Sequence, residues 1–195
     1  MKSFAGAIFL IGGILAIYFF WPQSTSLPKM GTVTEWELTE VGTGAVPPLD
    51  KPKLITFFYT NCPDICPTTM IDLQNLQQSM AEEGITEDQY MIVSITLDPA
   101  YDTEERILQY KEAFGISTSN WLFLRGSEEE IIRFTESFNF VFEKNKDGFL
   151  THSTSMYMVD SKNQIRSNHD MSMGDKKVNN EVIIRHFRQL IKEAE

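Results

Sequence analysis

The pattern of the chain changes abruptly within one run, which reads Leu54-Ile55-Thr56-Phe57-Phe58-Tyr59-Thr60-Asn61-Cys62-Pro63-Asp64-Ile65-Cys66-Pro67. Its first six residues are mostly β-branched and aromatic, which predicts a buried strand over residues 54–59. After the break at Cys62-Pro63, apolar residues recur at helical spacing, which predicts a helix over residues 68–82. Both cysteines of the chain therefore stand where a strand gives way to a helix.

This position has consequences for the two thiols. The unpaired N–H groups and the positive dipole of a helix N-terminus favour thiolate, which is both the nucleophile and the metal ligand. A three-residue spacer suits a disulfide, with sulfurs about 2.05 Å apart. It also suits two sulfurs roughly 4 Å apart that bind the same metal ion. Asp64 adds a negative charge that would raise thiol pKa values and help to retain a cation. The spacing alone leaves a redox pair, a metal site and a structural disulfide open.

Length and charge limit the class of protein. At 195 residues, one domain is expected. The formal net charge of -10 argues against nucleic acid, which is bound mainly through Lys and Arg. It is compatible with a metal ion or a cationic partner, and equally with a soluble acidic surface. The chain offers three histidines as further ligands: His152, His169 and His186.

The N-terminus predicts a membrane anchor. The stretch Phe4–Trp21 carries no charge and is almost wholly apolar, and Lys2 precedes it. That is just long enough for a transmembrane helix, with the N-terminus inside. We therefore expect an anchor over residues 1–22, a tether over 23–31 and one domain over 32–195. A cleaved signal peptide is the alternative, and either way the domain is exported to a compartment that permits disulfides.

Strands and helices alternate along the rest of the chain. A first strand is expected over Thr32–Leu38. Helices are expected to alternate with strands at 54–59, 91–97 and 121–124. The second helix is expected to begin with an Asp102 N-cap, and the third with a Ser127–Glu130 capping box. A strand hairpin around residues 145–148, further strands over 151–160 and 164–166, and a last helix over 178–191 follow. This order predicts a mixed sheet flanked by helices, in the thioredoxin pattern.

Three segments together resemble the Sco/SenC family. They are Tyr59-Thr60-Asn61-Cys62-Pro63-Asp64-Ile65-Cys66-Pro67, Asp98-Pro99-x-x-Asp102-Thr103 and His152-Ser153-Thr154-x-x-Tyr157-x-Val159-Asp160. The resemblance covers roughly residues 53 to 160. It implies an α/β thioredoxin-like fold, an N-terminal membrane anchor and an association with copper delivery to cytochrome c oxidase.

The resemblance also assigns residues. Cys62 and Cys66 match the family's copper thiolates, His152 its imidazole ligand, and Asp98 an acidic residue placed near that site. Two thiolates and one imidazole suit copper, as Cu(I) or Cu(II). The implied partner is the copper-bearing subunit of the oxidase, with another copper chaperone or a thiol reductant as further partners. The implied location is a bacterial cell membrane, with the domain on the extracytoplasmic side.

Alternatives remain at this stage. An extracytoplasmic thiol–disulfide oxidoreductase would attack with Cys62 and resolve with Cys66, so enzyme activity is left open. Peroxide reduction by Cys62 is a weaker alternative. An expected polar loop carries copper-type ligands at alternate positions, namely His169, Met171 and Met173. This segment is either an auxiliary copper site or simply a loop. His186 is expected to be structural.

Overall fold

The computed structural model describes residues 26–34, 36–146 and 149–194. The expected anchor over residues 1–22 lies outside this range. Among the helices described, none is long and apolar enough to cross a membrane.

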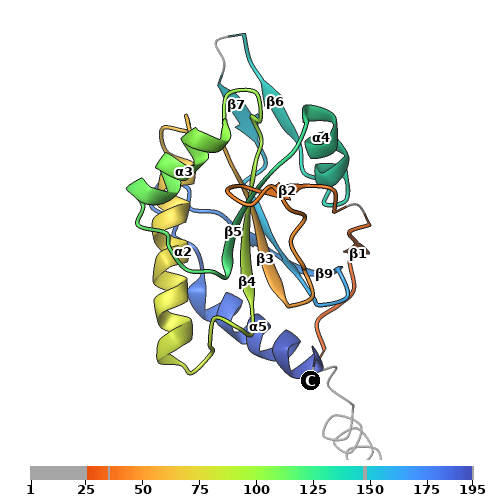
Figure 1. Cartoon of the computed structure of the whole chain (residues 1–195). Helices are drawn as coiled ribbons and strands as arrows, with labels where there is room; N and C mark the ends of the chain where they lie inside the picture. The colour runs from red at the N-terminus through yellow and green to blue at the C-terminus, as the bar shows by residue number, and fades with distance from the viewer. Residues whose placement is uncertain (1–25, 35, 147–148, 195) are drawn as a thin grey trace, which may run out of the picture.

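A mixed seven-stranded sheet forms the centre of the molecule, in the order β1-β9-β8-β3-β4-β5-β2 (Figure 1). Strands β3, β4 and β5 are parallel, and β8, β9, β1 and β2 join antiparallel to their neighbours. The bounds are β1 Gly31–Thr32, β2 Thr39–Glu40, β3 Lys53–Phe58, β4 Met91–Thr96, β5 Trp121–Arg125, β8 Ser155–Val159 and β9 Gln164–Asp170. The expected mixed α/β architecture is confirmed.

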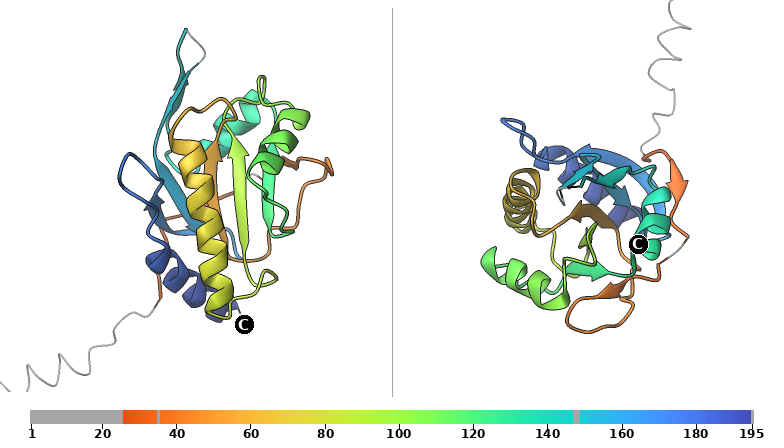
Figure 2. Two further views of the ribbon diagram at one scale, coloured as in Figure 1. Left: turned by 90° about the vertical axis from the view of Figure 1, so that its left-hand side faces the viewer. Right: turned by 90° about the horizontal axis from the view of Figure 1, so that it is seen from above.

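In the described part of the chain, four helices flank the sheet and a short ribbon stands apart from it. The helices are α2 Ile65–Glu82, α3 Glu104–Ala113, α4 Glu128–Glu136 and α5 Asn180–Ala194. Helices α2, α3 and α5 cover one face, and α4 covers the other (Figure 2). Strands β6 (Phe142–Lys144) and β7 (Leu150–His152) pair only with each other among the described strands, as a two-stranded ribbon.

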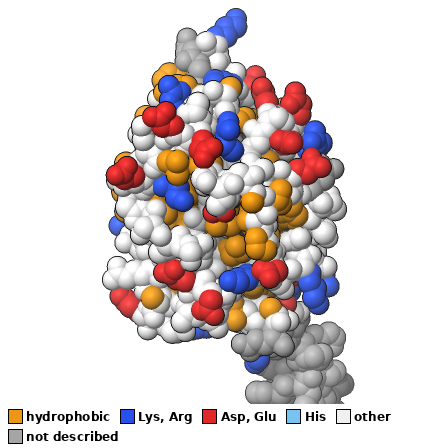
Figure 3. Space-filling view, in the orientation of Figure 1, with side chains coloured by type: hydrophobic (Ala, Val, Ile, Leu, Met, Phe, Trp, Pro, Cys, Tyr) orange, Lys and Arg blue, Asp and Glu red, His pale blue; other side chains and the backbone are white. Residues whose placement is uncertain are grey.

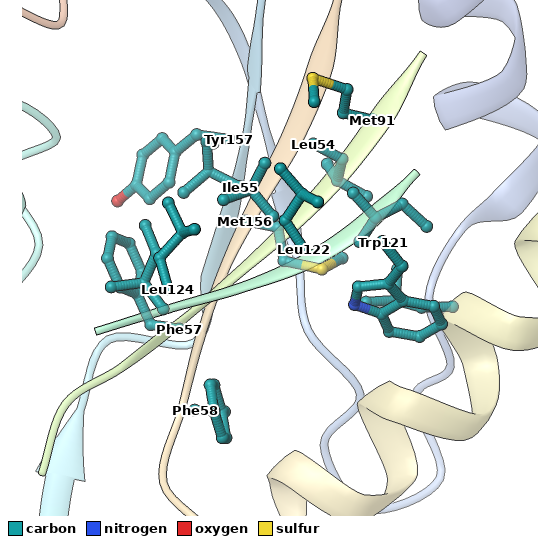
Figure 4. Close-up of a cluster of buried hydrophobic side chains, with 14 of the residues drawn as sticks. Leu54, Ile55, Phe57, Phe58, Met91, Trp121, Leu122, Leu124, Met156 and Tyr157 are labelled. Atoms are coloured by element: carbon teal, nitrogen blue, oxygen red, sulfur yellow. The ribbon is translucent and has the colours of Figure 1, made fainter. Parts of the chain in front are cut away.

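Successive aromatic residues of β3 fill the two layers of the core. Side chains alternate between the faces of a strand, and Figure 4 shows Phe57 and Phe58 pointing to opposite sides of β3. Phe58 stacks on Tyr110 of α3, with ring centroids 5.5 Å apart. Phe57 meets Phe134 of α4 edge to face, with centroids 6.3 Å apart. The central strand is therefore buried on both faces, as its unbroken apolar run predicts.

Several expected boundaries are wrong. Among the described residues of the expected strand Thr32–Leu38, only Thr32 belongs to a strand, at the end of β1, and β2 begins after the range at Thr39. Val33 and Leu38 are still buried in the core. These two apolar residues therefore pack into the core without belonging to a strand.

Helix α2 begins at Ile65, three residues earlier than expected, so it includes Pro67. A proline is tolerated in the first turn because the N–H that it lacks would have no partner there. Helix α3 is capped by Thr103, whose side chain accepts from the Arg106 N–H, and not by Asp102. The Ser127–Glu130 capping box of α4 is confirmed.

Candidate metal centre

The cysteines lie in the turn that joins β3 to α2. The Cys62 N–H donates to the Tyr59 carbonyl across 3.2 Å, which closes the turn after the strand. Cys66 lies in the first turn of α2. Both side chains are buried, and neither forms a disulfide. The early start of α2 therefore brings the second cysteine into the helix N-terminus itself.

The two sulfurs have opposite electrostatic environments. A hydrogen bond from the Cys66 thiol lowers the pKa of Cys62, and hydrogen bonds from His152 and from the backbone N–H groups of Asp64 and Cys66 lower it further, while burial opposes them. The Cys66 N–H donates to the Cys62 sulfur at 3.4 Å. The pKa of Cys66 is raised by its bond to Cys62 and by burial. The pair is thus a thiolate at Cys62 beside a thiol at Cys66, as the helix N-terminus favours.

His152 ends strand β7 and comes to this pair from the ribbon. Its hydrogen bond to Cys62 places the imidazole beside the thiolate. The Nδ1 atom lies 2.7 Å from the Ser153 carbonyl. Because a carbonyl only accepts, Nδ1 carries a proton, and Nε2 is the ring nitrogen left to face the sulfur or a metal ion. The Phe140 ring stacks on the imidazole at 6.0 Å and the Tyr59 ring meets it edge-on at 6.1 Å.

The ribbon that carries His152 borders an open groove. A cavity of about 430 Å³ separates it from α4 and the loop after β4, and Asp98, Ile132, Phe142 and Lys144 are among its lining residues. One ion pair crosses this space: Lys144 Nζ lies 2.6 Å from Asp98 Oδ2. The carboxylate is buried, while the lysine is half exposed. Asp98 therefore ties the ribbon to the body of the domain.

Asp98 forms no hydrogen bond with Cys62, Cys66 or His152 in the described structure. Its other hydrogen bond is accepted from the Tyr101 N–H at 3.4 Å, and Asp98 N–H donates to Thr96. In the ribbon, Lys144 is paired with Leu150, two residues before His152. Any influence of Asp98 on the imidazole consequently runs through the position of the ribbon.

Asp102 supports the cysteine turn, a role that the expected N-cap did not anticipate. Its fully buried carboxylate accepts from the Thr60 N–H at 3.2 Å, from the Thr60 hydroxyl, and from the Thr96 hydroxyl at 2.5 Å. Burial raises the pKa of Asp102. The charge of Asp102 also raises the pKa of Cys66. One hint of a different role for Asp102 is present in the sequence, because Thr103, itself a good N-cap, follows it directly and can cap the helix instead.

The ligand atoms are close without being fully gathered. In the parts of the chain that the structure describes, no group of three His, Cys, Asp or Glu side chains is already arranged to hold a metal ion. Charged side chains of both signs are interspersed on the face seen in Figure 3. The chemistry of two sulfurs and an imidazole Nε2 nevertheless fits a soft or borderline cation.

The expected group of His169, Met171 and Met173 does not form. His169 belongs to strand β9, and not to a loop. Met171 is fully buried, whereas Met173 is exposed. His169 instead meets His186 of α5, with ring centroids 5.1 Å apart.

Comparison with known proteins supports the resemblance noted above. Residues 42–191 match the SCO1/SenC family. The SCO1 protein homolog of Bacillus subtilis is 31% identical over 109 residues, which are 54% of this chain and 55% of that protein. The aligned region thus spans about half the length of this curated relative.

Two solved structures share the fold. Arabidopsis thaliana ScoI with copper bound has a TM-score of 0.66 at 24% identity, covering 78% of this chain and 95% of that one. BsSco, described as having a disulfide switch and as a member of the Sco family of cytochrome c oxidase assembly proteins, has a TM-score of 0.72 at 22% identity. That match covers 85% of this chain and 98% of BsSco.

Proposed function

This chain belongs to the SCO1/SenC family, and we propose that it binds copper through Cys62, Cys66 and His152 and delivers it to the dinuclear copper centre of cytochrome c oxidase. The observation that carries the proposal is the meeting of the thiolate, the thiol and the imidazole at one end of the sheet. The copper-bound ScoI and the oxidase-assembly protein BsSco, which share the fold, support it.

Each ligand has a defined part in binding. Cys62 is ready as a thiolate, because its pKa is lowered. Cys66 gives up its proton when the metal binds, since a coordinated sulfur is deprotonated. His152 offers Nε2, while its Nδ1–H is fixed on the Ser153 carbonyl. A small displacement of the ribbon towards the sulfurs would complete a trigonal set that suits Cu(I) and resembles cupric thiolate sites.

The place of action is part of the proposal. We expect residues 1–22 to anchor the chain in the cell membrane with the domain on the extracytoplasmic side, where the oxidase subunit would meet it. Protease added to intact spheroplasts should digest the domain and leave the N-terminal segment in the membrane fraction. Protection of the domain in intact spheroplasts would contradict this location.

Copper titration of the reduced protein tests the proposal. Against a competing Cu(I) chelator, the protein should take up copper, and His152→Ala should weaken binding by more than about 100-fold, since loss of outer partners alone costs about 10–100-fold. His186→Gln is the matched control and should keep the tight site. In the cupric form, thiolate-to-copper absorption and nitrogen coupling in magnetic resonance are expected. Equal affinity in His152→Ala would refute this ligand set.

A second candidate is a thiol–disulfide oxidoreductase, favoured by the opposite pKa shifts of the two cysteines. Cys62 thiolate would attack a partner disulfide and form a mixed disulfide as the partner's leaving sulfur departs as a thiolate. Cys66 would then lose its proton and attack the Cys62 sulfur, which releases the reduced partner and oxidises the pair. Reduction of a disulfide substrate that persists in His152→Ala, with an added dithiol such as dithiothreitol to reduce the Cys62–Cys66 pair again, together with unchanged copper affinity, would favour this activity over copper delivery.

A further inference from the structure

A second cluster of ligand-type side chains joins strand β9 to helix α5. His169 Nε2 and His186 Nδ1 face each other across 3.3 Å. The Ser167 hydroxyl lies 3.0 Å from each of these nitrogens. Three potential ligand atoms from two elements therefore form a compact triangle, although 17 positions separate the two histidines.

The spacing of the nitrogens is that of a metal site. A tetrahedral ion with nitrogen bonds of about 2.0–2.1 Å holds two imidazole nitrogens roughly 3.3–3.4 Å apart. A hydrogen bond between the rings would join the same two nitrogens, but 3.3 Å is longer than the usual donor–acceptor distance of such a bond. The serine oxygen lies 3.0 Å from both nitrogens, close enough to act as a third ligand after a small shift or to hold a bound water.

The protonation state suits a cation. Burial and the neighbouring His186 lower the pKa of His169 to about 4. Burial and Arg185 lower the pKa of His186. Both rings are therefore neutral at neutral pH, the form that binds metal. Both side chains are only partly buried, so a hydrated ion could reach them.

The surrounding charges are mixed. Asp170 acts on His169 and raises its pKa, while Arg185 acts on His186 in the opposite sense. The Asp170 carboxylate is already paired with Lys176 at 2.5 Å. The cluster thus offers two imidazoles and a hydroxyl without a free carboxylate. Such a set favours Zn²⁺, Co²⁺ or Cu²⁺ over Mg²⁺ or Ca²⁺, which prefer oxygen ligands.

We propose that His169, His186 and Ser167 form a second, cysteine-independent binding site for a divalent first-row transition metal ion. Bound water would complete the coordination, and the ion would clamp the last helix to the sheet. The site uses no residue of the proposed copper centre, so each can be removed while the other is kept.

The test uses the full chain, without an affinity tag, carrying Cys62→Ser and Cys66→Ser to remove the thiolates. Titration with Zn²⁺, or with Co²⁺ followed by its visible absorption, should show one ion bound. Adding His169→Gln or His186→Gln should weaken binding at least tenfold, and Ser167→Ala should weaken it less. His152→Gln is the matched control and should leave the affinity unchanged. Binding that survives both histidine changes, or that falls equally with His152→Gln, would overturn the proposal.

A second measurement needs no histidine variant. In the same double-serine protein, Zn²⁺ should shift the imidazole proton resonances of His169 and His186 and leave those of His152 in place. Zn²⁺ should also raise the melting temperature, because it binds the folded state. Unmoved His169 and His186 resonances at saturating Zn²⁺ would likewise reject the site.

Discussion

The sulfurs and the imidazole of the proposed copper centre are held by two very different regions. Cys62 and Cys66 sit between a strand buried on both faces and an 18-residue helix, and buried Asp102 holds the turn before them. His152 comes from a two-stranded ribbon beside an open groove. The core therefore fixes the sulfur side, while the imidazole side can adjust its position.

The largest expected effect comes from cutting the support of the sulfur side. Asp102→Ala leaves the partly buried Thr60 N–H and the buried Thr96 hydroxyl without their acceptor, so the free energy of unfolding should fall by about 2–4 kcal/mol. Urea denaturation measures this change. Asp102→Asn, which keeps one acceptor oxygen, should lose less. A stable Asp102→Ala protein with normal copper affinity would show that Asp102 does not hold the sulfur side in place.

Cutting the support of the imidazole side should act on affinity and spare the fold. Asp98→Asn removes the ion pair between the buried Asp98 carboxylate and half-exposed Lys144, and because the ammonium stays in contact with water the pair should contribute only about 1 kcal/mol to stability. Copper affinity should fall roughly tenfold, as for other outer partners of a metal ligand. Lys144→Met should reproduce this change, and Lys146→Met is its control. A larger loss of stability than of affinity would show that the ribbon is as rigid as the core.

The sulfur pair itself can be distinguished by its reactivity. The lowered pKa of Cys62 keeps it a thiolate well below the usual thiol range, so iodoacetamide should modify it at slightly acidic pH. Cys66, with its raised pKa, should resist modification even at alkaline pH. Peptide mass spectrometry after timed labelling gives both rates. His152→Ala should move the Cys62 profile to higher pH, and faster labelling of Cys66 would reverse the assignment.

The smallest effect is expected away from both regions. The pKa of His169 is about 4 in the folded protein, below its ordinary value near 6.5. The unfolded chain therefore binds the additional proton, and the stability that the neutral ring contributes is lost as the pH falls from about 6.5 towards 4. Comparing urea midpoints of the parent and His169→Gln over this range isolates the contribution. Parallel pH profiles would show that His169 does not contribute.

The sequence predicted the central features of the fold for physical reasons. A continuous β-branched and aromatic run indicates a strand buried on both faces, and β3 is such a strand. The cysteine pair at a strand-to-helix junction also follows from local pattern. The start of α2 could not be predicted as well, because Pro67 reads as a break although a first turn tolerates it.

Contacts between residues far apart in the sequence could not be predicted from the local sequence pattern. Asp102 looked like a cap because it precedes a helix, whereas its actual partners, Thr60 and Thr96, lie on other segments. The His169–His186 pair was hidden for a similar reason. The polar residues at the end of β9 resemble a loop, so nothing in the sequence placed His169 opposite the last helix.

The entry point of the chain has a consequence for how a partner would be met. The Arg166 guanidinium, near the start of β9, donates hydrogen bonds to the carbonyls of Leu27 and Pro28, and β1 pairs with β9 beside it. This is the end of the sheet opposite the β3–α2 turn (Figure 1). Six residues of β3 separate the two ends by about 20 Å. If residues 1–22 anchor the chain in a membrane, as proposed, the β3–α2 turn with its two cysteines would face away from the lipid, towards a partner that projects above it.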